Sequence, residues 1–180
     1  WMPETKVYYL IGMMGVGKSS IGLGAARKLD FSFIDLDDYI RKSEKFSINE
    51  IFKKMGEQGF RELEKKYLRS LNFDGMDNVI VSTGGGTPAF NDNMDYMNDN
   101  GTTIWLETPV SEIVERLKDM QDDRPLISSM KGNQLELQLQ AMYDLRLPEF
   151  EKAKLRLENV GYDYQVIEKL VSMIEEDSRK

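Results

Sequence analysis

Eight residues near the N-terminus constrain the fold of this chain more than any other feature. They read Gly12-Met-Met-Gly-Val-Gly-Lys-Ser19 and match the spacing G-x-x-x-x-G-K-[ST] in full. The residues before them, Lys6–Ile11, are mostly apolar strand formers, and residues 19–29 carry small and apolar side chains at helical spacing. A glycine-rich turn between a buried strand and a helix N-terminus presents backbone N–H groups to phosphates. The sequence therefore predicts a phosphate-binding loop.

Different residues of the loop are expected to contact different parts of a bound nucleotide. Lys18 is expected to reach the outer phosphates, and the Ser19 hydroxyl to ligate magnesium. The alternative is a glycine-rich turn that arose by chance, which four fixed positions allow in about 1% of chains of this length. We expect a bound nucleoside triphosphate, with Mg²⁺ as cofactor. The nucleotide-binding candidates in this segment, which the family resemblance described below assigns to ATP, are Gly12, Met13, Met14, Gly15, Val16, Gly17, Lys18, Ser19 and Ser20.

Strand and helix patterns alternate along the rest of the chain. Strands are predicted at residues 31–35, 78–82, 102–107 and 153–157, and helices at residues 47–56, 58–71, from 109 onward, 134–145 and 164–176. Such alternation produces a parallel sheet with helices on both faces. The fold class is therefore α/β, a three-layer α/β/α P-loop fold with a five-stranded parallel sheet, in one domain over residues 1–180. The polar residues 118–133 are expected to form a mobile loop.

The composition and net charge of the chain limit the kinds of partner that we expect it to bind. The net charge of −7 and the pI near 4.8 argue against nucleic acid or an anionic membrane surface. The chain has no cysteine, no histidine and no apolar run of about 20 residues, so we expect a cytoplasmic protein whose proton transfers use a carboxylate. No coiled-coil seam is visible, and a monomer is expected. Trp1 precedes Met2, which we take as the natural start.

Acidic residues end the second predicted strand, in Phe33-Ile-Asp35-Leu-Asp37-Asp38. Asp35 and Asp37 are two positions apart, so in an extended chain they point to the same side of the strand tip. Asp35 is the candidate for holding Mg²⁺, and Asp37 for orienting or deprotonating an acceptor hydroxyl. The alternative is that all three aspartates start the following helix.

Glycines and arginines supply the other candidates. Gly84-Gly85-Gly86 follows the third strand and leaves room for a ligand or for close packing. Glu64 lies three residues after Arg61, a spacing that allows an ion pair. Arg124 lies in the predicted mobile loop, and Arg146 is expected to end a helix before Pro148. Each of these arginines could instead be an exposed surface residue without a functional role. Arg146 could also simply interact favourably with the C-terminus of its helix.

These motifs together resemble the shikimate kinases over residues 6–153. The matching segments are the phosphate loop, the D-x-D at 35–37, the F-R-x-x-E at 60–64, the S-T-G-G-G at 82–86, the R-P-L at 124–126 and the R-x-P at 146–148. The resemblance implies a nucleoside-monophosphate-kinase-like fold with a lid at about 118–133 and a helical substrate-binding region at about 36–73. It also implies transfer of the γ-phosphoryl group of ATP to the 3-hydroxyl of shikimate, in aromatic amino-acid biosynthesis.

The resemblance also implies residue roles. Lys18, Ser19 and Asp35 serve MgATP, and Arg124 serves both ATP and the transferring group from the lid. The implied catalytic residues are Asp37, Lys18 and Arg124. The implied shikimate-binding residues are Asp37, Arg61, Gly84, Gly85, Gly86 and Arg146. Asn159 lies where the family's adenine-contacting loop falls and is the candidate there.

Two other functions stay open at this point. One is a related small-metabolite kinase such as gluconate kinase, and the other is a nucleotide-dependent switch that has the fold without catalysis. The combination of F-R-x-x-E with three glycines disfavours the first. The presence of Lys18, Ser19, Asp35, Asp37 and Arg124 disfavours the second.

Overall fold

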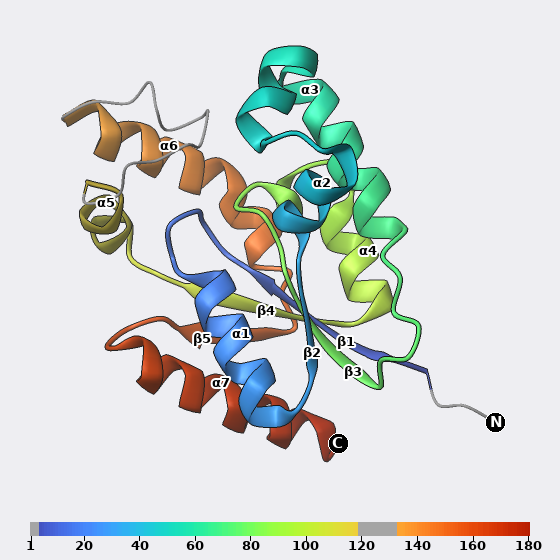
Figure 1. Ribbon diagram of the computed structural model, residues 1–180. Helices are drawn as coiled ribbons and strands as arrows, with labels where there is room; N and C mark the ends of the chain where they lie inside the picture. Colours follow the sequence, from blue (N-terminus) through green and yellow to red (C-terminus); the bar gives the residue numbers. More distant parts are fainter. Residues whose placement is uncertain (1–3, 119–132) are drawn as a thin grey trace.

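One parallel sheet forms the centre of the molecule (Figure 1). The computed structural model describes residues 4–118 and 133–180, and in these residues the sheet has five strands in the order β2-β3-β1-β4-β5. Neighbouring strands are parallel throughout, with Leu10 of β1 opposite Ser82 of β3 and Ile104 of β4. The predicted five-stranded parallel sheet is confirmed. The strands are β1 (Lys6–Ile11), β2 (Ser32–Asp35), β3 (Asn78–Ser82), β4 (Thr102–Glu107) and β5 (Leu155–Glu158).

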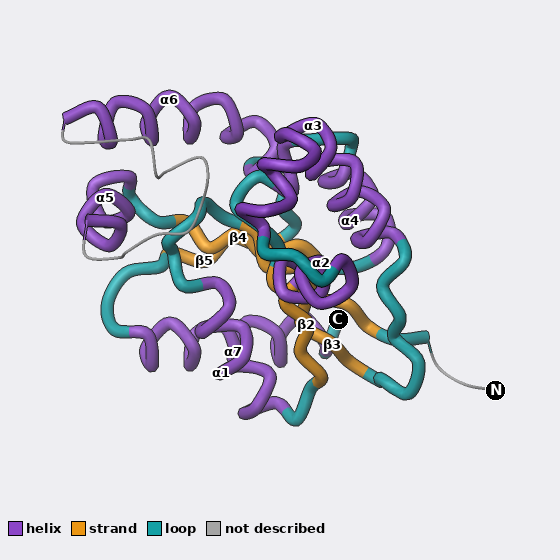
Figure 2. Tube along the Cα trace, turned by 45° about the horizontal axis from the view of Figure 1, so that its top comes forward, coloured by secondary structure: helices purple, strands orange, loops and turns teal. Residues whose placement is uncertain are grey.

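Helices cover both faces of this sheet (Figures 1 and 2). Helices α1 and α7 pack against each other on one face, and α4 and α6 lie on the other. The predicted three-layer arrangement is thus confirmed. The helices are α1 (Lys18–Leu29), α2 (Leu36–Glu44), α3 (Ile48–Arg69), α4 (Asn93–Asn100), α5 (Val110–Lys118), α6 (Asn133–Phe150) and α7 (Asp163–Ser178), with a 3₁₀ turn η1 (Thr87–Ala89).

The strand sequences follow from their place in the sheet. Strands β1, β3 and β4 lie in the interior of the sheet with helices on both faces, and all but their end residues are buried. A strand buried on both faces is continuously apolar, which explains why these three strands were predicted with their observed bounds. The edge strands β2 and β5 are only partly buried and have mixed sequences.

Helices α2 and α3 stand together beyond the end of β2 (Figure 1). Helix α3 starts with a capping box, in which the Ser47 hydroxyl accepts from the backbone N–H of Glu50 and the Glu50 side chain accepts from the backbone N–H of Ser47. Gly56 interrupts the helix with φ 71° and ψ 179°, a conformation that a side chain would disfavour. The two helices predicted on either side of Gly56 are therefore two segments of α3.

Helices α6 and α4 differ from the prediction. Helix α6 does not end before Pro148 but continues to Phe150. Pro148 lies in the last turn, so its missing N–H removes only one hydrogen bond near the helix end, and the fully buried ring of Phe150 stacks on Trp105. Helix α4 was not predicted, because its polar sequence shows the helical period only through the buried Met94 and Met97.

The predicted lid at 118–133 lies outside the described residues except for its two ends. Of the helices in residues 4–118 and 133–180, none combines the length and the apolar character needed to cross a membrane.

Candidate active site

The phosphate loop connects β1 to α1 at the carboxyl end of the sheet. Its glycines Gly12, Gly15 and Gly17 have φ values of 150°, 78° and 83°, which side-chain-bearing residues rarely adopt. A Cβ atom on Gly12 would also lie 2.9 Å from the carbonyl oxygen of Leu106. The three glycines of the loop therefore satisfy a backbone requirement, and the loop wraps around the N-terminus of α1.

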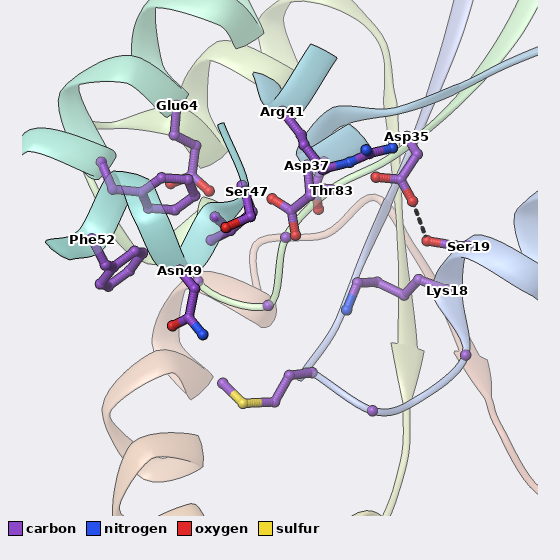
Figure 3. A pocket seen from close by; sticks show the side chains of 18 of the residues that line it. Lys18, Ser19, Asp35, Asp37, Arg41, Ser47, Asn49, Phe52, Glu64 and Thr83 are labelled. Atoms are coloured by element: carbon purple, nitrogen blue, oxygen red, sulfur yellow. Dashed lines mark hydrogen bonds between the residues drawn. The ribbon is translucent and has the colours of Figure 1, made fainter. Parts of the chain in front are cut away.

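Lys18 begins α1 and extends back across this loop (Figure 3). Its side chain is buried, and its ammonium group donates to the carbonyl oxygens of Gly12 at 2.7 Å and Met13 at 2.8 Å. The positive charge is thus held inside the curve of the loop, where phosphate groups bind in loops of this type.

The far side of the loop is anchored through the carbonyl oxygen of Val16. It accepts hydrogen bonds from Asn159 Nδ2 at 2.8 Å and from Arg116 Nη1 at 3.1 Å. Asn159 is fully buried and also donates to Thr108 Oγ1 at 3.0 Å. The suggestion that Asn159 contacts the adenine base is therefore wrong, because its amide supports the phosphate loop from behind.

Ser19 and Asp35 meet at the start of α1 (Figure 3). The Ser19 hydroxyl donates to Asp35 Oδ2 and lies 3.4 Å from the hydroxyl of Ser82. The other carboxylate oxygen of Asp35 accepts from the backbone N–H of Asp38 at 3.0 Å and caps α2. Hydroxyl and carboxylate oxygens are ligands that suit Mg²⁺, which commonly takes one or two protein oxygens together with substrate phosphates. This pair therefore fits the predicted ion.

Asp37 lies in the first turn of α2, so the assumption of an extended chain through Asp35 and Asp37 is wrong. The chain turns helical at Leu36, because Asp35 caps the helix. Both carboxylates nevertheless line the same pocket. Asp38 does not cap the helix with its side chain but forms surface ion pairs with Arg41 and Lys42.

Arg61 and Glu64 form the ion pair that their spacing predicted. Arg61 Nη1 donates to Glu64 Oε1 at 3.0 Å, and both residues are buried, Glu64 completely. The Arg61 guanidinium also lies over the ring of Phe90, 4.2 Å from its centroid. A buried carboxylate on one side and an aromatic face on the other fix the guanidinium in one orientation.

The three glycines after β3 pass between the phosphate loop and Arg61. A Cβ atom on Gly85 would lie 2.7 Å from the backbone nitrogen of Met14, and one on Gly86 would lie 2.6 Å from Arg61 Nη2. A Cβ atom on Gly84 would lie 3.1 Å from Asp37 Oδ1. The reason for three successive glycines is therefore close packing and not an unusual backbone conformation.

Arg146 reaches the site from α6. It is buried, and its Nη1 donates to the carbonyl oxygen of Gly85 at 3.1 Å. Burial, together with the positive charge of Arg61, lowers the pKa of Arg146 to about 10. The side chain remains a cation at neutral pH. Two buried guanidinium groups that repel each other are an arrangement that a bound anion would stabilise.

One pocket of about 1040 Å³ joins these groups (Figure 3). It extends from the phosphate loop to the buried arginines, so it is large enough for a nucleotide and a second small molecule. The predicted residues that line it include Lys18, Ser19, Asp35, Asp37, Arg61, Glu64, Gly84, Gly85, Gly86 and Arg146. Arg124 lies outside the described residues.

Sequence reasoning missed several residues that also line the pocket. Arg116 lies on the amphipathic helix α5, and Asn49 and Phe52 point into the pocket from the first segment of α3 (Figure 3). Because the sequence around Arg116 matches no motif and Phe52 has the spacing of a core residue, only the shape of the fold identifies them.

The fold and the pocket define a P-loop phosphotransferase, with a phosphate loop at one end of the site and two buried arginines, Arg61 and Arg146, at the other. Residues 14–175 match the family model described as shikimate kinase. The chain belongs to this family. It is 40% identical to a shikimate kinase of Persephonella marina over 92% of this chain and 97% of that protein.

Solved structures agree with this assignment. A shikimate kinase from Bacteroides thetaiotaomicron superposes with a TM-score of 0.86 and 33% identity, covering 97% of this chain and 99% of the other. A shikimate kinase from Acinetobacter baumannii in complex with shikimate gives a TM-score of 0.85 and 29% identity, covering 98% of this chain and 96% of the other.

Proposed function

We propose that this protein transfers the γ-phosphoryl group of ATP to the 3-hydroxyl group of shikimate. The observation that carries the proposal is the single pocket in which Lys18 and the phosphate loop face Asp37, Arg61 and Arg146. Shikimate offers one carboxylate and three hydroxyl groups. An anion-binding arginine pair beside an aspartate matches that chemistry, because it fixes the carboxylate and directs one hydroxyl group toward the nucleotide.

The transfer step needs orientation more than covalent chemistry. The 3-hydroxyl oxygen forms a bond to the γ-phosphorus, the bond from that phosphorus to the β–γ bridging oxygen breaks, and ADP leaves. The hydroxyl proton passes to the carboxylate of Asp37. Lys18 neutralises charge on the phosphates, and we assign Arg124 the same role from the lid. The products are shikimate 3-phosphate and ADP.

Ser19 and Asp35 are the residues that would hold Mg²⁺. When bound, this ion neutralises phosphate charge and helps to fix the position of the β- and γ-phosphates. The contact between the two side chains supports this assignment, because it brings both candidate oxygen ligands together at the base of the phosphate loop.

The experiment measures ADP release by the purified protein with MgATP, with and without shikimate, and with gluconate as a parallel acceptor. We expect ADP release that depends on shikimate. Release stimulated only by gluconate would leave the phosphate-loop assignment in place and overturn the roles of the arginines. If neither shikimate nor gluconate stimulates ADP release, the proposed function is contradicted.

A further inference from the structure

We infer that Thr87 is a positioning residue that holds Arg61 and the glycine segment in the geometry that binds the acceptor. Thr87 is the first residue of η1, is fully buried and does not line the pocket. It therefore acts through other residues and does not touch either substrate. The inference rests on the proposed function, because its test uses shikimate.

The Thr87 hydroxyl connects the two walls of the acceptor site. It accepts a hydrogen bond from the backbone N–H of Gly84 at 2.9 Å and lies 2.8 Å from Glu64 Oε2. A hydroxyl has one proton to donate, and the amide of Gly84 already acts as a donor. The proton of Thr87 is therefore directed at the carboxylate of Glu64.

The carboxylate of Glu64 connects the Thr87 hydroxyl to the guanidinium of Arg61. One of its carboxylate oxygens accepts from Thr87 and the other accepts from Arg61 Nη1 at 3.0 Å. Glu64 has no exposed surface, so its carboxylate depends on protein donors for stabilisation. The orientation of the Arg61 guanidinium is thereby coupled to the position of the Gly84 backbone through one hydroxyl group.

The backbone of Thr87 is also fixed from the far end of α3. Its carbonyl oxygen accepts from Asn93 Nδ2 at 2.9 Å, and Asn93 Oδ1 accepts from Arg69 Nη1 at 2.6 Å. Arg69 and Arg61 lie on the same segment of α3, after the break at Gly56. Helix α3 and the glycine segment are therefore joined at two places, and Thr87 takes part in both.

Removal of the hydroxyl takes one hydrogen-bond partner from each of two buried groups. The Gly84 amide loses its acceptor and Glu64 loses one donor, each of which costs more than an average hydrogen bond. The Glu64 carboxylate then shifts and takes Arg61 with it. A small displacement of a binding group weakens a substrate complex considerably, whereas the phosphate loop on the other side of the pocket keeps its own contacts.

The test compares Thr87→Val, which keeps the shape and removes the hydroxyl, with Thr87→Ser, which keeps the hydroxyl. A matched control is Thr103→Val. Thr103 is also fully buried, and its hydroxyl donates to Asn98 Oδ1 at 2.6 Å and accepts from the backbone N–H of Lys154 at 2.9 Å. It lies near the start of β4, away from the carboxyl end of the sheet.

We expect Thr87→Val to raise the KM for shikimate about tenfold while the KM for ATP changes less than about twofold. Thr87→Ser should restore the wild-type KM, and Thr103→Val should lower the thermal midpoint without changing either KM. If Thr87→Val does not fold, Thr87→Ala is measured against the same criteria.

An equal rise in the KM values for shikimate and ATP would overturn the inference, as would a Thr87→Val variant that loses stability without a change in either KM. In both cases the proposed function stands, because the wild-type protein still releases ADP in the presence of shikimate. If the wild-type protein shows no ADP release that depends on shikimate, the proposed function fails and the role of Thr87 in acceptor binding fails with it.

Discussion

Gly85 lies directly against the phosphate loop, so close to Met14 that a Cβ atom on Gly85 would come within 2.7 Å of the Met14 backbone nitrogen. Gly85→Ala should therefore displace the loop and raise the KM for ATP, because backbone cannot move aside as a flexible side chain does. We expect a rise of at least about fivefold in steady-state assays with saturating shikimate.

The neighbouring substitution Gly86→Ala serves as a matched control for this prediction. Its Cβ atom would meet Arg61 Nη2 at 2.6 Å and not the phosphate loop. Gly86→Ala should raise the KM for shikimate much more than the KM for ATP. If the two alanine variants have the same effects on both substrates, the glycine segment does not separate the two sites as described.

Substitution of Arg146 should have opposite effects on the stability of the protein and on shikimate binding. The side chain is buried beside the positive charge of Arg61, and this environment lowers the pKa of Arg146. Arg146→Met removes the repulsion, so the thermal midpoint without ligand should rise by about 2–4 °C. The same variant should raise the KM for shikimate at least about tenfold, because one cation of the carboxylate site is lost.

A second arginine variant controls for the change in net charge. Arg27→Met removes a positive charge from an exposed position on α1, and it should change neither the thermal midpoint nor the KM for shikimate measurably. A lower thermal midpoint for Arg146→Met together with an unchanged KM for shikimate would show that Arg146 is a structural residue.

Asp37 is expected to carry the proton transfer. Asp37→Asn keeps the size of the side chain and removes the base, so turnover should fall by about 100-fold or more while the KM for ATP changes less than about threefold. Asp38→Asn is the control, because Asp38 is the next residue and makes only surface ion pairs in the structure described. Turnover of Asp37→Asn within about threefold of Asp38→Asn would exclude a role in proton transfer.

Asp35 combines two functions that two substitutions can separate. Asp35→Asn keeps an oxygen that can cap α2 and removes the negative charge, whereas Asp35→Ala removes both. Both variants should need a higher Mg²⁺ concentration for half-maximal ADP release. Only Asp35→Ala should also lower the free energy of unfolding, by about 1 kcal/mol. A Mg²⁺ requirement equal to that of the wild-type protein in both variants would exclude Asp35 as a ligand.

The sequence was most informative where one physical requirement acts on several adjacent residues. Strands β1, β3 and β4 are buried on both faces, so each of them is apolar along its length and was predicted with its observed bounds. The phosphate loop was predicted for a similar reason, because the backbone angles of Gly12, Gly15 and Gly17 leave little choice of residue.

Prediction was less successful where tertiary contacts decide the structure. Helix α6 continues past Pro148 because the Phe150 ring is packed against Trp105, and no local pattern carries that information. Asn159 is adjacent to the strand β5 in sequence, but its partner Val16 is 143 positions away. A hydrogen bond over that distance in the chain is visible only after the sheet brings the two segments together.

The glycine segment after β3 also has an evolutionary consequence. Its three residues are packed against the phosphate loop, Arg61 and Asp37, where an added Cβ atom would lie only 2.6–3.1 Å from the nearest atom, so the segment has little room for side chains. A descendant of this chain that acquires a different acceptor cannot do so by adding a contact from this wall. Such a change is more accessible on helix α3, where Asn49 and Phe52 present side chains to the pocket.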